Sequence, residues 1–302
     1  AFLVTRTLKV KRESLQTKNN FFISARGLPL NLLKKKQPEW ITNKGVSLSL
    51  LEQQPVNSLP QKAPLNGHHK TLIVIPSFNE EASIGEVIED IKKHAPGVNI
   101  LVINDGSVDK TAELAESHGA KVISLPYNSG YGVALQTGYL YACKHNYSIV
   151  VQMDADGQHD AACIQDLLCS VYSNDVDVVI GSRFLGQNSY RTTLARRIGM
   201  FIFGKLASLF CKERVSDPTS GFQAVKGKAI NFIASDYYPP DYPDADFLIM
   251  LSQCGFKIRE IPVKMHPSKV KKSMHGGPQS IYYVFKMFLS IFVTLLRKKP
   301  KI

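Results

Sequence analysis

Two aspartates, Asp154 and Asp156, stand two residues apart in the segment MDADGQHD, directly after the apolar run SIVVQM. In an extended chain alternate side chains point to the same side, so both carboxylates are expected on one face. Hard oxygen ligands at this spacing suit Mg²⁺ or Mn²⁺, which take further ligands from water and substrate phosphates. The pattern therefore predicts a divalent-cation site, and the alternative is an ordinary acidic turn after a strand.

From residue 71 onward, short apolar runs alternate with amphipathic stretches, which is typical of a parallel sheet covered by helices. The predicted fold class is therefore α/β. Apolar residues at three- and four-residue spacing mark the helices, and short unbroken apolar runs mark the strands. Strands are expected at 71–75, 99–104, 121–125, 148–153 and 176–181, and helices at 80–94, 108–117, 130–144 and 160–172.

Polar segments follow four of these expected strands. In open parallel α/β sheets, ligands bind beyond the carboxyl ends of the strands. The four segments are therefore expected to face one crevice. They are Pro76 to Glu80, Asp105 to Ser107, Asp154 to His159, and Ser182-Arg183.

Two positions in these turns have competing interpretations. Asp105 is predicted either to accept hydrogen bonds from a nucleobase or a ribose, or to cap the helix that starts near Val108. Gly130, in NSGYGVA, allows a close approach of the backbone to a ligand, or simply closes a tight turn. The dinucleotide fingerprint would need a third glycine where Leu135 stands, and no phosphate-loop Lys-Ser/Thr follows, so NAD and ATP binding lose their main support.

A series of motifs between residues 71 and 265 resembles the family 2 glycosyltransferases of the GT-A fold. The resemblance is to the dolichyl- or polyprenyl-phosphate mannose or glucose synthase-like branch in particular. It implies a GT-A nucleotide-sugar-binding fold, a mostly parallel sheet flanked by helices. The motifs, in order, are IPSFNEE, INDGSVDKT, NSGYGVALQTG, MDADGQHD, IGSRF and DPTSGFQA.

The resemblance also assigns roles to residues. Arg183 and one of Arg196 or Arg197 would meet the acceptor phosphate or the donor diphosphate, and Asp217 and Ser220 would belong to the acceptor side. For both arginines of the pair the alternative is a solvated surface position. On the donor side, Pro76, Phe78, Glu80 and Asp105 would line the nucleotide pocket, and Asp154, Asp156 and Gln158 would serve the metal and the diphosphate.

The implied reaction is a single displacement with inversion at the anomeric carbon, from a nucleoside-diphosphate sugar. A polyprenyl phosphate acceptor is already ionised and needs no catalytic base. A hydroxyl of a glycan, glycolipid or protein would need one, and Asp246 or Asp244 is then the candidate, with helix capping as the alternative role. Gln223 stands where many relatives have arginine, which removes one cation from the acceptor side.

The net charge of +12 is unevenly distributed along the chain. Residues 1–70 carry twelve Lys or Arg against three acids, and 264–302 carry nine against none, whereas the stretch between them is acidic. This suits a bound cation flanked by surfaces that contact anionic lipid. Binding of nucleic acid, or a non-catalytic sugar-nucleotide binding module, remains as an alternative from another functional class.

Three segments are predicted: a basic arm or linker over 1–70, a catalytic domain over 71–265, and a basic loop with an amphipathic helix over 266–302. The run 281–296 is too short to span a bilayer and contains Lys286. Its apolar face, which includes Phe288, Ile291 and Phe292, lies opposite a polar stripe with Ser290. We expect an interfacial helix on an anionic membrane, and the alternatives are packing on the domain or a homo-oligomer interface.

Five scattered cysteines and the lack of a visible secretory signal indicate reduced thiols and a cytoplasmic location. Together with the amphipathic helix, they predict a peripheral protein on the cytoplasmic face of a membrane.

Overall fold

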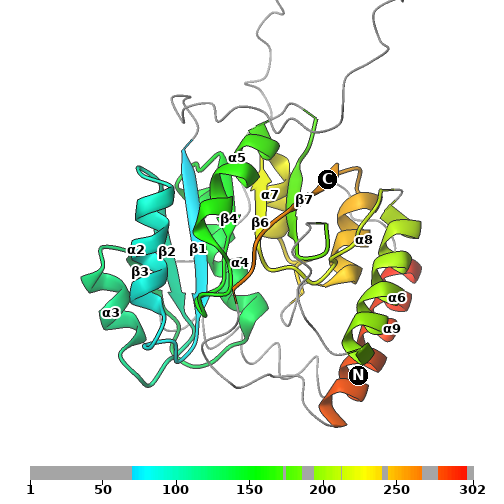
Figure 1. The fold of residues 1–302 in the computed structure, drawn as a ribbon, viewed down its shortest axis with the longest axis horizontal. Coiled ribbons are helices and arrows are strands. Elements are labelled where there is room, and N and C mark those ends of the chain that lie inside the picture. The colour runs from blue at the N-terminus through cyan, green and yellow to red at the C-terminus, as the bar shows by residue number, and fades with distance from the viewer. Residues whose placement is uncertain are drawn as a thin grey trace, which may run out of the picture. The chain divides into compact units, whose positions relative to one another are not determined.

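A seven-stranded sheet forms the centre of the structure (Figure 1). The structure is a computed structural model that describes residues 70–172, 175–185, 194–211, 213–239, 244–266 and 278–297, with only the backbone for 194–202 and 278–285. In spatial order the strands are β3 (Lys121–Ser124), β2 (Asn99–Asn104), β1 (Thr71–Ser77), β4 (Ile149–Gln152), β6 (Gln223–Lys226), β5 (Val178–Ser182) and β7 (Ile258–Pro262).

The sheet is mostly parallel, as the sequence predicts. Strands β1 to β4 run parallel to one another, and β5 runs parallel to β7. Strand β6 lies between β4 and β5 and is antiparallel to both. The five strands expected from sequence are confirmed within two residues at each end, whereas β6 and β7 were not anticipated. Strand β6 has only four residues, and β7 (IREIP) alternates charged and apolar residues, so neither forms an apolar run.

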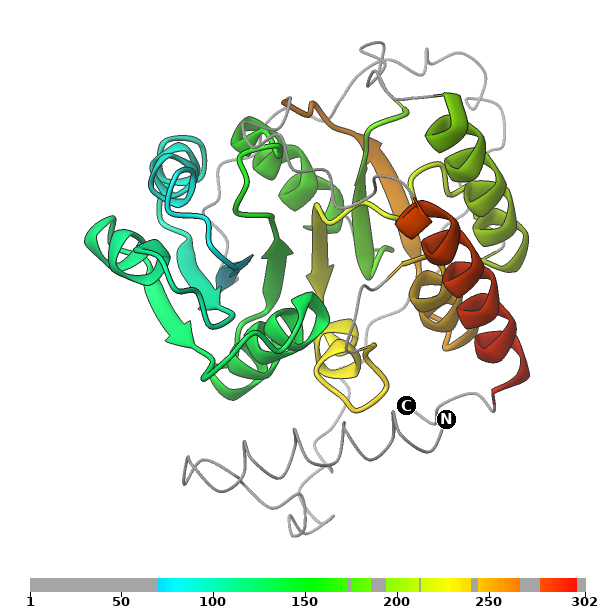
Figure 2. The same ribbon diagram turned by 90° about the horizontal axis from the view of Figure 1, so that it is seen from below.

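Helices cover both faces of the sheet, because alternate strand residues point to opposite sides. In β1, Leu72 and Val74 belong to one core cluster, and Ile73 and Ile75 belong to the other. Figure 2 shows helices on both sides of the sheet. One layer comprises α2 (Ile84–His94), α3 (Thr111–Ser117), the 3₁₀ turn η1 (Ala161–Cys163) and α5 (Ile164–Tyr172); the other comprises α4 (Tyr131–Lys144), α6 (Leu194–Cys211), α7 (Lys228–Ile233), α8 (Ala245–Gln253) and α9 (Pro278–Leu296).

Helices α2 and α3 begin three to four residues later than expected. The sequence places their starts at residues 80 and 108, whereas the structure starts them at Ile84 and Thr111. The residues before each helix instead form hydrogen-bonded loops at the carboxyl end of the sheet, and Asn79 adopts a left-handed backbone there with φ of 55°. These loops are therefore part of the site, not of the helices.

Helix α9 packs against α8 and still leaves apolar residues exposed. Met287 and Ile291 are buried in the core, and the Ser290 hydroxyl donates a hydrogen bond to Asp246 of α8. Ser290 therefore faces the domain, in line with the alternative that the helix packs on the domain, while Phe288 and Phe292 are exposed. Across the described residues, no helix combines the length and the apolar character needed to cross a membrane.

Several expectations fall outside the described residues. They concern the arm over residues 1–69, the basic loop over 267–277, and the side chains of Arg196, Arg197 and the first turns of α9.

Gly138 on α4 lies directly against Val74 of β1. A Cβ atom at position 138 would collide with Val74 Cγ1. Gly138→Ala should therefore lower the free energy of unfolding by about 1–3 kcal/mol, although alanine favours a helix by about 1 kcal/mol over glycine. Chemical denaturation measures this. The double variant with Val74→Ala should lose less than the sum of the two single variants, and strict additivity would contradict the proposed contact.

Candidate active site

The loops that follow β1 and β2 are joined by side-chain-to-backbone hydrogen bonds. The backbone N–H of Asn79 donates to Ser107 Oγ (2.9 Å), and the N–H of Val108 donates to Asn79 Oδ1 (3.0 Å). The N–H of Glu80 donates to Thr111 Oγ1 (2.8 Å). Because each loop satisfies backbone donors of the other, the two loops form one preformed edge of the crevice.

Asp105 joins this edge to the loop before α4. It is 4% exposed, and its two carboxylate oxygens accept the backbone N–H groups of Ser129 (2.6 Å) and Gly130 (2.9 Å). Gly130 has φ of 105°, a conformation that favours glycine. Asp105 thus fixes the loop that precedes α4, a role that differs from both roles considered from sequence. Asp109 Oδ1 accepts the Thr111 N–H at the start of α3, in line with local capping.

The two aspartates after β4 have different neighbours. Asp154 Oδ1 accepts a hydrogen bond from the Tyr131 hydroxyl (2.7 Å), and Asp154 Oδ2 lies 3.5 Å from His159 Nε2. Asp156 accepts two bonds from Gln158, from its backbone N–H (2.9 Å) and its side-chain amide (2.7 Å). The loop thus presents two carboxylates, each with its orientation fixed by donors.

Burial, with a further contribution from neighbouring negative charges, raises the pKa of two carboxyl groups at this site, Asp156 and Glu80. Burial, followed by the charge of Asp154, raises the pKa of Asp156. Burial also raises the pKa of Glu80, with a smaller contribution from the charges of Asp156, Asp109 and Asp154. A cation placed among these carboxylates would relieve that repulsion.

The ligating side chains fit Mg²⁺ or Mn²⁺ only if the substrate supplies the remaining ligands. No group of three or more His, Cys, Asp or Glu side chains in the described part of the chain is arranged to hold a metal ion. Mg²⁺ is usually bound through one or two carboxylates plus substrate phosphates and waters. Asp154 and Asp156 supply that number, and Gln158 adds an amide next to them.

A cavity of about 680 Å³ borders the aspartate loop on the side of α2. Gly157 and His159 of the loop contribute to its wall, together with Ser83 and Val87, whereas neither Asp154 nor Asp156 does. We therefore take the crevice at the strand ends, and not this cavity, as the candidate site.

Arg183 forms a buried, forked ion pair at the end of β5. Its Nε and Nη2 atoms each lie 2.6 Å from an oxygen of Asp217, and Nη2 also donates to Thr219 Oγ1 (2.9 Å). Glu260 holds the turn at Ser216 and Asp217. Its carboxylate accepts hydrogen bonds from the backbone N–H groups of both residues and from the Ser216 hydroxyl. This network fixes Arg183 directly after the carboxyl end of β5 and partly neutralises its charge.

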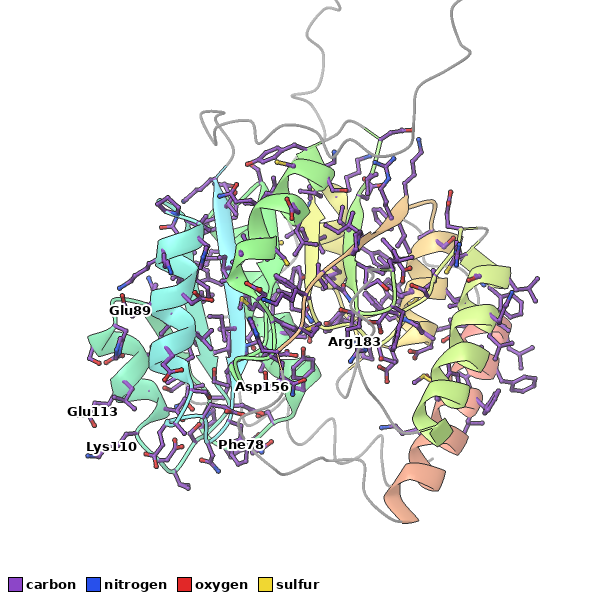
Figure 3. All side chains as sticks on the ribbon, viewed as in Figure 1. Phe78, Glu89, Lys110, Glu113, Asp156 and Arg183 are labelled. Atoms are coloured by element: carbon purple, nitrogen blue, oxygen red, sulfur yellow. The ribbon has the colours of Figure 1, made fainter. Side chains whose placement is uncertain are left out.

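The other expected residues are distributed as follows. Pro76 is buried within β1, and Phe78 is exposed at the crevice; Figure 3 shows Phe78 and Asp156 at the same end of the sheet. Ser220 is buried and donates to the Gly181 carbonyl (2.6 Å). Asp246 contacts Ser290, and no contact with the aspartate loop appears among the described residues.

Sequence reasoning assigned no individual role to Tyr131, His159 or Glu260. Tyr131 lies in the motif NSGYGVALQTG and His159 in MDADGQHD. Their closeness in sequence to Gly130 and Asp156 could therefore have marked them as site residues. Glu260 has no such signal, because it lies 43 residues after Asp217.

Comparisons with known proteins identify the family of the chain. The model of "Glycosyl transferase family 2" matches residues 72–234. The polyprenol monophosphomannose synthase of Mycolicibacterium smegmatis is 27% identical, over 72% of this chain and 85% of the relative. The dolichyl-phosphate hexose transferase of Haloferax volcanii is 30% identical, over 63% and 80%.

Solved structures show the same fold. The glucosyl-3-phosphoglycerate synthase of Mycobacterium tuberculosis, in complex with Mn²⁺, UDP-glucose and glycerol 3-phosphate, superposes with a TM-score of 0.57. The alignment covers 81% of this chain and 85% of that one, at 20% identity. The chain therefore has the GT-A fold expected from its motifs.

Asp105→Asn should loosen the loop at Ser129 and Gly130. Asparagine offers one acceptor oxygen, so one of the two backbone N–H groups would face an NH₂ group, at a cost of about 1–3 kcal/mol. Hydrogen exchange of the peptide spanning 127–133 should accelerate. Glu113→Gln makes the corresponding change from carboxylate to amide at an exposed site on α3 and is the control. Unchanged exchange in Asp105→Asn would contradict the assigned role.

Proposed function

Because the chain belongs to glycosyl transferase family 2, we propose that this glycosyltransferase moves a hexose from a nucleoside-diphosphate sugar to a polyprenyl phosphate at a membrane surface, with inversion. The proposal of a nucleoside-diphosphate sugar as donor rests on the aspartate loop, which lies next to the preformed loops after β1 and β2. The acceptor half is supported by the relatives named for polyprenyl- or dolichyl-phosphate sugar transfer.

Asp154, Asp156 and Gln158 would hold the divalent cation. When bound, the cation neutralises charge on the departing nucleoside diphosphate. Phe78 and Glu80 border the crevice where the base and ribose would lie, and the Asp105 bonds keep the backbone of Gly130 fixed close by. These residues bind and orient the donor, and the loops restrict the positions that the donor can occupy.

The acceptor side favours a group that is already ionised. A phosphate oxygen attacks without losing a proton, so no base is required, and Asp246 is turned toward Ser290 of α9. Arg183 at the end of β5 supplies positive charge at the crevice, although Asp217 shares it. Transfer to a hydroxyl is the alternative, and it would require Asp246 or another carboxylate to act as base.

The membrane contact is assigned to the outer surface of α6 and α9. Exposed apolar side chains lie on these helices: Leu209 on α6, and Phe288, Leu289, Phe292, Val293 and Leu296 on α9. Helix α9 is followed by Arg297, Lys298, Lys299 and Lys301, and the last 39 residues contain no acid. An apolar helix face with basic residues at its end suits an anionic bilayer, and for this reason we choose lipid over a second copy of the chain.

Asp156→Asn should reduce hexose transfer by on the order of 100-fold or more, because a metal ligand beside the diphosphate is lost. The assay uses purified protein, labelled UDP-glucose or GDP-mannose, Mn²⁺ and polyprenyl phosphate, and counts label extracted into organic solvent. EDTA should abolish the signal, and added Mn²⁺ should restore it. Glu89→Gln on the exposed surface of α2 is the control.

The outcomes separate the candidate functions. Extractable product supports the phosphate acceptor, whereas label on a glycan or protein supports a hydroxyl acceptor. Donor binding without transfer to any acceptor would instead indicate a non-catalytic module.

Phe292→Glu and Leu296→Glu should each weaken binding to vesicles of phosphatidylglycerol and phosphatidylcholine by about tenfold. Each removes an apolar side chain that would be buried in the lipid on binding. Sedimentation with vesicles measures the bound fraction. Leu140→Glu, on the exposed surface of α4, should bind normally. Unchanged vesicle binding, together with a shift from dimer to monomer in the two α9 variants, would assign the face to a second copy.

A further inference from the structure

Asp154 is held by Tyr131 from α4 and by His159 at the end of its own loop, whereas Asp156 is held by Gln158, two residues further on. The Tyr131 hydroxyl, at the start of α4, donates to Asp154 Oδ1 (2.7 Å). The His159 ring contacts Asp154 twice, at its backbone N–H and near Oδ2. The hydrogen bonds found on the Asp156 carboxylate within the described structure come from Gln158.

The hydrogen bonds of His159 define its tautomer. The backbone N–H of Asp154 donates to Nδ1 (3.0 Å), so Nδ1 carries no proton. In the neutral ring the proton is therefore on Nε2, which lies 3.5 Å from Asp154 Oδ2. One imidazole thus contacts both the backbone and the carboxylate of the same residue.

The His159 ring is itself held in place. It is 5% exposed and stacks on the fully buried ring of Phe222, with centroids 4.8 Å apart and planes 9° apart. Its backbone forms an isolated antiparallel bridge with Met265. The ring is therefore restrained between the aspartate loop and the segment that enters β6.

The Tyr131 hydroxyl is restrained as well. It accepts a hydrogen bond from the side-chain amide of Gln152, the last residue of β4 (3.2 Å). Gly221 lies on the other side, where a Cβ atom would stand 2.9 Å from the Tyr131 hydroxyl and 3.0 Å from Asp154 Oδ2. The backbone before Tyr131 is fixed by Asp105 through the N–H of Gly130.

We propose that Tyr131 and His159 are positioning residues that fix the Asp154 carboxylate before the metal and the donor bind. The proposal rests on the metal-dependent function stated above. Asp154 has 32% of its side chain exposed, so it remains accessible from the crevice while held. Each carboxylate oxygen has more than one lone pair, so one hydrogen bond does not prevent coordination.

Mn²⁺ binding to the full chain tests this without any transfer assay. Electron paramagnetic resonance counts free Mn²⁺ in titrations with and without UDP. Tyr131→Phe removes one hydroxyl and should weaken Mn²⁺ binding by about 10-fold or more, as loss of an outer-shell partner does at other metal sites. Tyr147→Phe, near the opposite end of the sheet, is the matched control and should bind normally.

Two substitutions at His159 separate its two contacts. Asparagine places an oxygen near the position of Nδ1 and can still accept the Asp154 N–H, whereas glutamine places its amide near Nε2 and cannot. Because the Nδ1 contact is the shorter one, His159→Asn should retain more Mn²⁺ affinity than His159→Gln. A general packing role would affect both equally, since both lose the stack on Phe222. Circular dichroism confirms that each variant is folded.

The outcomes distinguish this proposal from the proposed function. Wild-type Mn²⁺ affinity in Tyr131→Phe, or equal affinities in the two His159 variants, would overturn the positioning roles. A wild-type chain that binds Mn²⁺ and UDP but transfers nothing to polyprenyl phosphate would overturn the proposed function and leave the positioning roles standing. A wild-type chain without Mn²⁺ affinity would overturn both.

Discussion

The buried carboxylate of Asp105 connects the separate loops of the site. It lies at the end of β2 and accepts the backbone N–H groups of Ser129 and Gly130, in the loop that leads into α4. A buried carboxylate needs such donors, because desolvation without them is costly. The bonds therefore hold the start of α4 against the sheet. Tyr131, the first residue of that helix, can then reach Asp154 in the loop after β4.

The general position of the site was predictable from sequence, because it follows from strand order. Parallel strands bring their carboxyl ends to one edge, so Asp105, Asp154 and Arg183 had to lie at the same end of the sheet. The partners of these residues were harder to predict. Arg183 pairs with Asp217, 34 residues away, and the turn carrying Asp217 is held by Glu260 of β7. These pairings depend on strand β6, which could not be recognised in the sequence because it has only four residues.

Helix α9 shows a second limit of sequence patterns. Periodicity correctly indicates an amphipathic helix, but it does not say which face meets the protein. The sequence left open whether the helix rests on a membrane or packs on the domain; Ser290 bonds to Asp246, and Met287 and Ile291 enter the core. Apolar residues lie on two sides of this helix, and they have different surroundings. One side packs against α8, and the other is exposed at Phe292 and Leu296.

The antiparallel direction of β6 restricts how the sequence can vary. Gln223, the first residue of β6, pairs with Gln152, the last residue of β4, so the segment from Asp217 to Phe222 enters the sheet where the aspartate loop leaves it. Side chains alternate along a strand, so if β6 kept its start at a fixed distance from Asp217, one inserted residue in this segment would turn every β6 side chain to the opposite face. Phe222 would then leave the His159 ring. The segment between Asp217 and Gln223 should therefore tolerate substitutions far better than insertions or deletions.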